Sequence, residues 1–130
     1  MAKIKDAVDL DLNFTKHPIT GDVSKTTGIA AIKRSVRNLI LLNSDDKPFH
    51  PEISTNTTSE LFENFTIFTG SDIEDKIKKT VERYEPRVRV EEVRSEPTFD
   101  KNEMTILVRI GFRNISGPTA TVPITIKRLR

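Results

Sequence analysis

The stretch Arg83-Tyr84-Glu85-Pro86-Arg87-Val88 marks the point at which a helical pattern ends and a strand pattern begins. Before it, apolar side chains recur every three or four residues, as on one face of a helix: Ile73, Ile77, Val81 and Tyr84. After it, apolar residues alternate with polar ones, as in strands with one buried face. Pro86 has no N–H to donate and restricts the preceding residue to extended conformations. The sequence therefore predicts a sharp helix-to-sheet joint that carries Glu85 and Arg87.

The composition is typical of one soluble domain spanning residues 1–130. Charged residues make up 31% of the chain and hydrophobic residues 35%, and a chain of this length buries about two-thirds of its unfolded surface. The 21 basic and 19 acidic side chains give a net charge of +2, too small to indicate a polyanionic partner. The chain has no cysteine, which excludes disulfides and thiolate metal sites. A signal-peptide pattern and a long apolar run are both missing, so no membrane partner is expected.

The N-terminal half is expected to contain an extended segment and two helices. Residues 8–14 alternate apolar and polar side chains, which predicts a short half-buried strand or an extended arm. The first long helix is expected to begin near Thr26 or Thr27, either of which can serve as its N-cap. A short helical turn over residues 59–65 then directs three apolar side chains into the core: Leu61, Phe62 and Phe65.

The C-terminal half is predicted to form a second long helix and three antiparallel strands. Ser71 and Glu74 fit a capping box that begins this helix. Beyond Pro86, alternating segments are separated by turns at residues 99–102 and 117–118, and Glu91-Glu92 interrupts the alternation as a β-bulge does. Helices followed by antiparallel strands indicate an α+β fold, with two main helices and a short one packed on a small sheet.

The acidic residues do not form a recognisable catalytic pair. A glycosidase needs two carboxylates across one cleft, one of them with a raised pKa. Glu52, Glu63 and Glu85 lie beside apolar or proline residues, but no spacing pairs any two of them. The chain has no tryptophan and one tyrosine, so a sugar-stacking cleft would be poorly supplied.

The sequence also offers few residues for a metal site or for nucleophilic catalysis. The two histidines, His17 and His50, both lie next to proline in expected loops and are too few to build a metal site. The sequence also lacks a glycine-rich phosphate loop and the common nucleophile motifs. We therefore expect no catalytic residues, no metal and no cofactor.

Basic residues are present on several expected elements, but their pattern favours solubilising charge over a nucleic-acid site. Aromatic residues are not interleaved with them as a base-stacking platform requires. The basic residues concerned are Lys33, Arg34 and Arg37 on the first helix, Arg109 and Arg113 on one strand, and Lys127, Arg128 and Arg130 at the end.

Several segments resemble a family of small baseplate proteins from contractile-tailed phages, which has a relative in the type VI secretion baseplate. Residues 32–40 and 47–52 resemble the family's basic helix and the Pro-x-x-Pro-like segment that follows it. Residues 61–64 resemble a further family stretch, and Tyr84-Glu85-Pro86-Arg87 resembles its Glu-Pro-Arg signature. Ser54 stands where the family usually has a glycine.

The resemblance implies a structural baseplate wedge protein that initiates assembly of the tail sheath and is not an enzyme. Its implied partners are the tail sheath protein, other wedge proteins and tail tube or hub proteins. It implies a place in the virion tail baseplate, after assembly in the host cytoplasm. Two alternatives remain open: a tail lysozyme, as members of the family have often been labelled, and a small nucleic-acid-binding module.

Two segments are candidate partner sites. On the residues alone, Glu85 and Arg87 are more readily solvated neighbours of a helix-stopping proline. If they instead dock the domain onto wedge partners, Arg87→Ala should leave thermal stability nearly unchanged yet impair baseplate assembly. The resemblance instead implies that Glu85, Pro86 and Arg87 contact the helical bundle at the core of the wedge. Pro123 places the last strand at a sheet edge, and the resemblance implies that sheath strands pair there with Val122, Pro123, Ile124 and Ile126.

Overall fold

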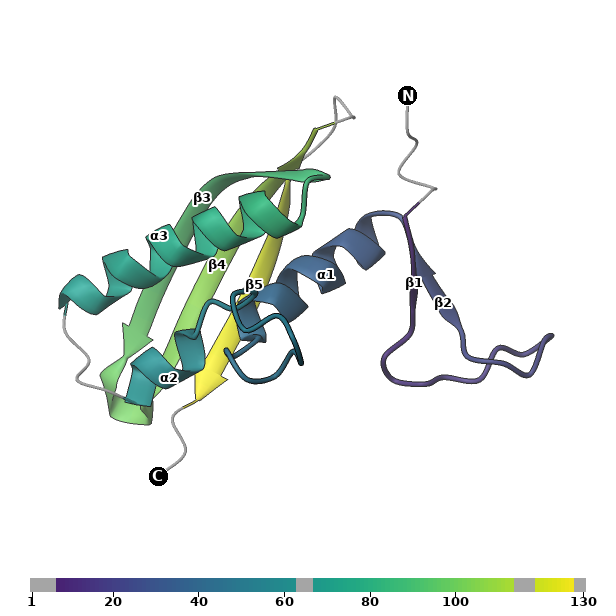
Figure 1. Ribbon diagram of the computed structural model, residues 1–130, viewed down its shortest axis with the longest axis horizontal. Helices are drawn as coiled ribbons and strands as arrows, with labels where there is room; N and C mark the ends of the chain where they lie inside the picture. Colours follow the sequence, from purple (N-terminus) through teal and green to yellow (C-terminus); the bar gives the residue numbers. More distant parts are fainter. Residues whose placement is uncertain (1–6, 63–66, 114–118, 128–130) are drawn as a thin grey trace.

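The computed structural model describes residues 7–62, 67–113 and 119–127, and these form a two-layer α+β arrangement, which confirms the predicted fold class (Figure 1). The helices are α1 (Ile29–Leu41), α2 (Thr57–Phe62) and α3 (Ile67–Tyr84). The main sheet consists of β3 (Val88–Thr98), β4 (Glu103–Phe112) and β5 (Ala120–Lys127), with the 3₁₀ turn η2 (Phe99–Lys101) between β3 and β4. A hairpin of β1 (Val8–Leu10) and β2 (Lys25–Thr27) precedes α1 and projects away from the sheet (Figure 1).

The core lies between one face of the main sheet and the two long helices. The sheet order is β3-β4-β5, and both strand pairs are antiparallel. Alternate residues of β4 and β5 are buried: Met104, Ile106, Val108, Ile110, Val122, Ile124 and Ile126. The helices contribute a matching stripe: Val36 and Ile40 from α1, and Ile73, Ile77 and Val81 from α3. Burying each such side chain stabilises the fold by about 1.5–3 kcal/mol, so this face determines how the helices dock.

The predicted β-bulge is present in β3. The register shifts between Val90 and Glu92, so Glu91 is the extra residue opposite β4. Gly111 lies on β4 beside the bulge, and a Cβ there would approach the Glu91 Oε1 atom to 2.8 Å. Glycine therefore leaves room for the Glu91 side chain to lie over β4.

The predicted starts of both long helices are wrong. The N-cap of α1 is Gly28, whose φ of 65° suits glycine, while Thr26 and Thr27 lie in β2. Helix α3 begins at Ile67, before the expected capping box of Ser71 and Glu74.

Long-range contacts explain both shifts. The hydroxyl of Thr26 accepts a hydrogen bond from Arg34, and its backbone pairs with Asp9. The Glu74 carboxylate accepts hydrogen bonds from the backbone N–H and the hydroxyl of Ser95 on β3, both at 2.7 Å. The predicted local caps are thus replaced by contacts with distant segments.

Two further expectations have mixed outcomes. The alternating residues 8–14 do not form a half-buried strand, because Val8, Leu10, Leu12 and Phe14 are all exposed; the extended arm is confirmed instead. The short helix expected at residues 59–65 is present as α2, but the side chains of Leu61, Phe62 and Phe65 lie outside the described residues. The expected turn at residues 117–118 also lies outside them.

Candidate functional site

The joint between α3 and β3 has the predicted form. The helix ends at Tyr84, where the N–H of Glu85 still donates to the Val81 carbonyl at 2.9 Å. The chain then turns at Pro86, and the N–H of Val88 donates back to the Glu85 carbonyl at 3.2 Å. Two backbone hydrogen bonds therefore fix Glu85 and Arg87 on either side of a rigid proline.

Glu85 is buried and bonded within the chain. Its carboxylate accepts from Arg87 twice, Nε to Oε1 at 2.6 Å and Nη2 to Oε2 at 2.7 Å. The Ser35 hydroxyl of α1 donates to the same Oε2 at 2.6 Å. Glu85 is 3% exposed, whereas the Arg87 side chain is 44% exposed. The expectation of a solvated Glu85 is therefore wrong, because its carboxylate is buried and bonded to Ser35 and Arg87.

The electrostatics of this cluster match its geometry. Burial raises the pKa of Glu85, but the hydrogen bonds from Arg87 and Ser35 outweigh burial and leave the pKa below its usual 4.5. The hydrogen bonds that Arg87 donates to Glu85 raise the pKa of Arg87, with a smaller contribution from the charge of Asp9 on β1. Glu85 thus holds the Arg87 guanidinium in one orientation, and Arg87→Ala is no longer expected to be neutral for stability, because it would leave a buried carboxylate with Ser35 alone.

Arg34, beside Ser35 on α1, fastens the projecting hairpin to the body. Its Nη1 atom donates to the Leu10 carbonyl at 3.3 Å, to Asp11 Oδ1 at 3.0 Å and to the Thr26 hydroxyl at 3.3 Å. Hydrogen bonds from the Thr15 hydroxyl, the Asn13 N–H and Arg34 lower the pKa of Asp11 to about 2. Arg34 therefore binds the arm and does not act simply as solubilising charge, the role that the sequence pattern favoured for it.

The last strand lies at an edge of the main sheet, as Pro123 predicted. Within the described residues β5 pairs with β4 alone, and Pro123 stands opposite Leu107. The side chains of Val122, Ile124 and Ile126 are buried in the core, so they are not available to a partner. Thr121, Pro123 and Thr125 are exposed on the other face. Only the backbone edge of β5 and these outward side chains can meet another chain.

Most of the candidate nucleic-acid residues that the structure describes are paired. Arg109 contacts Glu92 at 3.1 Å, Lys127 contacts Glu103 at 2.9 Å, and Arg113 Nε donates to the Val88 carbonyl at 3.1 Å. Arg128 and Arg130 lie outside the described residues. This pairing favours solubilising charge over a phosphate-binding surface.

The pKa values of the described candidate acids are lowered, whereas a general acid needs a raised pKa. The pKa of Glu52 is lowered by its own backbone N–H and by the exposed His50 ring, whose Nδ1 lies 3.0 Å from Glu52 Oε1. The pKa of Glu85 is lowered too, and Glu63 lies outside the described residues. His17 Nδ1 accepts the N–H groups of Ile19 and Thr20, both at 3.3 Å, and so has a role in a turn. A general acid of a glycosidase needs a raised pKa, so these two carboxylates are poorly suited to that role.

Neither a metal-binding cluster nor a membrane-spanning helix occurs among the described residues. Within them, histidine, aspartate and glutamate side chains do not gather into groups of three or more that could hold a metal ion. The described helices include none that is long and apolar enough to cross a membrane.

Sequence reasoning missed two contacts of α1: the bond from Ser35 to Glu85 and the bonds from Arg34 to the arm. Ser35 is separated from Glu85 by 50 residues, and Arg34 from Leu10 by 24. The sequence contains no local signal for either contact, because each depends on how α1 packs against a distant segment.

Comparisons with known proteins address the whole fold. A family model described as baseplate wedge protein gp25 matches residues 26–118. Baseplate wedge protein gp25 of Enterobacteria phage T4 is 35% identical over 97 residues, which are 75% of this chain and 72% of the T4 protein. A chain in the cryo-EM structure of the anti-feeding prophage baseplate has a TM-score of 0.70 at 23% identity, covering 84% of this chain and 87% of that one. A Geobacter sulfurreducens crystal structure, provisionally described as a tail lysozyme, has a TM-score of 0.61 at 18% identity, covering 75% and 89%.

Proposed function

Because the chain belongs to the family of baseplate wedge protein gp25, we propose that it is a single-domain wedge component that docks onto its neighbours and starts the tail sheath. Its partners in this proposal are other wedge proteins, the sheath protein, and tail tube or hub proteins. It acts in the tail baseplate of the virion after assembly in the host cytoplasm. Docking uses the joint after α3, and sheath initiation uses the edge of β5.

The docking role is supported by the difference in exposure between Glu85 and Arg87. Glu85 is buried and takes two N–H groups of the guanidinium, while nearly half of the Arg87 side chain stays exposed. A planar guanidinium held in one orientation can bind a carboxylate or a carbonyl of a partner with little loss of side-chain freedom. In this proposal Arg87 and the exposed Pro86 touch the wedge partner, and Glu85 positions Arg87.

Arg87→Lys tests this docking role. Lysine keeps the positive charge but cannot reproduce the two-point contact with Glu85, so the guanidinium's orientation is lost. We expect a stability loss of about 1 kcal/mol and a much larger loss of incorporation into wedge complexes, measured by co-purification with wedge proteins.

Arg89→Lys is the matched control. Arg89 lies two residues further along β3, is 70% exposed, and contacts Glu91 only at 3.7 Å, so both readouts should stay unchanged. Wild-type incorporation of the Arg87→Lys protein would contradict the docking role.

The support for sheath initiation is the outer edge of β5, which is unpaired among the described residues. An unpaired edge is a template for another strand, and strand addition uses main-chain hydrogen bonds. The buried Val122, Ile124 and Ile126 hold β5 on the core, while its outer edge faces away from β4. A rigid, anchored strand of this kind suits the addition of strands from the first sheath subunits.

We further propose that the protein is not a lysozyme. The likeness to the provisional tail lysozyme is 18% identity, a level that indicates a shared fold and not a shared activity. Purified protein should leave the turbidity of a peptidoglycan suspension unchanged at acidic and neutral pH, with a commercial lysozyme as positive control. Clearing that disappears in a folded Glu52→Gln variant would overturn this conclusion.

A further inference from the structure

The projecting N-terminal arm, residues 7–27, carries a concentration of exposed apolar side chains. Eight large hydrophobic residues are exposed in the part of the chain that the structure describes, and five of them belong to the arm. These five are Val8, Leu10, Leu12, Phe14 and Ile19, with exposures of 55%, 54%, 53%, 72% and 89%. The arm thus carries most of the exposed large apolar side chains of the described residues, and contiguous exposed apolar surfaces mark contact sites.

The face of the arm that is turned toward the body is polar. Asp11 and Thr26 both accept hydrogen bonds from Arg34 of α1, so the face that they share is turned toward the body. Asp9 lies opposite Thr26 in the hairpin, and its charge acts on Arg87. Because successive strand residues point to opposite faces, Val8 and Leu10 are turned away from the body. On the outward side, Val8 and Leu10 lie beside their hairpin partners Thr27 and Lys25, and Leu12 and Phe14 are exposed in the turn that follows. The exposed apolar side chains Val8, Leu10, Leu12 and Phe14 are termed the apolar face.

Contacts at the base of the arm and with Arg34 oppose a rotation of the arm that would bury this face on its own chain. Its base is fixed, since Ala7 is buried and the Gly28 N–H donates to the Ala7 carbonyl at 2.8 Å. Turning the arm over would break the three Arg34 hydrogen bonds, of which the Asp11 pair is charged. An isolated two-stranded hairpin is marginally stable in water, so the Arg34 contacts also keep the arm formed. Among the described residues, the apolar face is therefore left exposed.

Phe14 at the turn is held in an unfavourable backbone conformation. Its φ is 53°, a left-handed value that is rare for a bulky residue. Hydrogen bonds of the turn impose this value: the Phe14 N–H donates to the Asp11 carbonyl at 2.9 Å, and the Ser24 N–H donates to the Thr15 carbonyl at 2.8 Å. An aromatic residue that is both strained and 72% exposed marks a candidate contact point.

The backbone groups of β1 at Leu10 are already hydrogen-bonded. At Leu10, the N–H is bonded to Asp9 Oδ1 at 2.9 Å and the carbonyl accepts from Arg34 at 3.3 Å. The edge groups of Leu10 are thus already satisfied and offer no template for an added strand.

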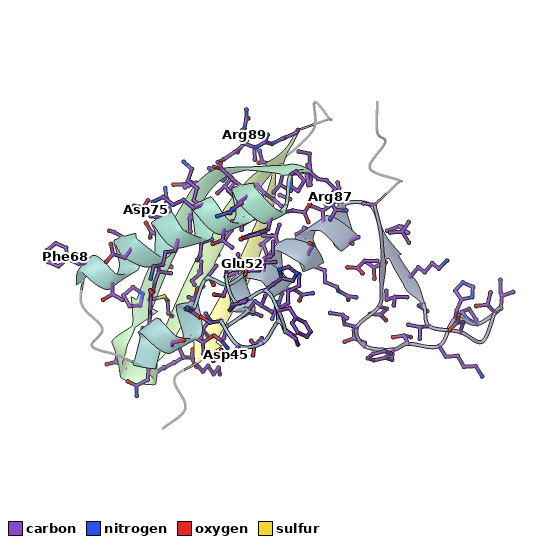
Figure 2. The ribbon with its side chains drawn as sticks, viewed as in Figure 1. Asp45, Glu52, Phe68, Asp75, Arg87 and Arg89 are labelled. Carbon is purple, nitrogen blue, oxygen red and sulfur yellow. The ribbon has the colours of Figure 1, made fainter. Side chains whose placement is uncertain are left out.

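The apolar face is too small to form a stable interface by itself, so its contact would add to a second contact with the same partner. A handful of half-exposed side chains amounts to a few hundred Å², below the roughly 800 Å² per partner of a stable stand-alone interface. The arm adjoins the docking joint, since the charge of Asp9 acts on Arg87 and Figure 2 places Arg87 on the side of the body nearest the arm.

We propose that the apolar face of the arm, formed by Val8, Leu10, Leu12 and Phe14, packs against an apolar surface of the same wedge neighbour that Arg87 contacts. This inference rests on the proposed docking function and extends it by a second, hydrophobic contact point.

The test is a double variant, Leu10→Thr with Phe14→Asn. Threonine suits a strand and asparagine tolerates the left-handed conformation, so thermal stability should be unchanged or higher. Binding to the purified wedge subcomplex lacking this chain should weaken at least about tenfold, because two anchoring apolar side chains are lost. The matched control is Phe68→Ser, which removes an 80% exposed aromatic residue at the far end of α3 and should leave binding unchanged (Figure 2).

Each other outcome decides against the proposal. Wild-type binding by the double variant, alongside weakened binding of Arg87→Lys, would overturn the arm contact and leave the docking function standing. A lowered melting temperature of the double variant would show that the apolar face is structural. A wild-type dimer that the double variant converts to a monomer would identify a second copy as the partner. If the wild-type chain does not bind the subcomplex at all, both the docking function and the arm contact fail.

Discussion

Replacing Glu85 by alanine is expected to lower the free energy of unfolding by about 3 kcal/mol. The carboxylate is 3% exposed and receives hydrogen bonds from Ser35 and twice from Arg87. Its removal leaves a small void and deprives a half-buried hydroxyl and a guanidinium of their partner. Chemical denaturation monitored by circular dichroism measures the difference. Glu96→Ala is the control, because Glu96 is exposed on the same stretch of sheet and should change stability by less than about 0.5 kcal/mol.

The pH dependence of the two proteins gives a second readout of the same cluster. The pKa of Glu85 is lowered in the folded state, so its contribution is fully present above the ordinary value of 4.5 and is lost as pH falls below it. The stability difference between wild type and Glu85→Ala should therefore shrink progressively in acid below pH 4.5. A Glu85→Ala protein as stable as wild type at neutral pH would show that this cluster does not hold the joint together.

Thr125→Pro is expected to abolish sheath growth while leaving the domain folded. Proline in a strand is tolerated where its missing N–H faces an open edge, so Pro123 indicates that the N–H groups of Thr121 and Thr125 point to the same outer edge. Thr125 is exposed, and proline there would remove an outward donor without disturbing the ladder to β4. Deleting β5 would be a poorer test, because Val122, Ile124 and Ile126 belong to the core.

The measurement is electron microscopy of tails assembled on baseplates that contain the variant. Thr125→Val keeps the N–H and the β-branched shape, so it should support sheaths of normal length. Baseplates should incorporate both variants equally, since position 125 lies on the sheet edge away from the Arg87 joint. Full-length sheaths on Thr125→Pro baseplates would exclude strand addition at this edge.

The main features of the sheet were predictable from the sequence because each follows from local sterics or from a repeating pattern. Pro86 ends α3 and fixes the joint, and Pro123 restricts β5 to an edge, because proline lacks an N–H wherever it stands. The alternation along β4 identifies its buried face, and the Glu91-Glu92 pair reveals the bulge. These signals lie within a few residues of the feature that they predict.

The candidate docking surface was decided by tertiary structure. Glu85 is buried because α1 packs against the joint and places Ser35, 50 residues away in sequence, beside its carboxylate. Glu74 does not form the expected capping box because its carboxylate binds Ser95 of β3 instead. The arm exposes its apolar face because Arg34 bonds its polar face. Periodicity shows that a strand has an apolar face but not which way that face turns. The direction in which an apolar face turns depends on contacts between segments that are distant in the chain. The energies of these contacts cannot be read from a local sequence pattern.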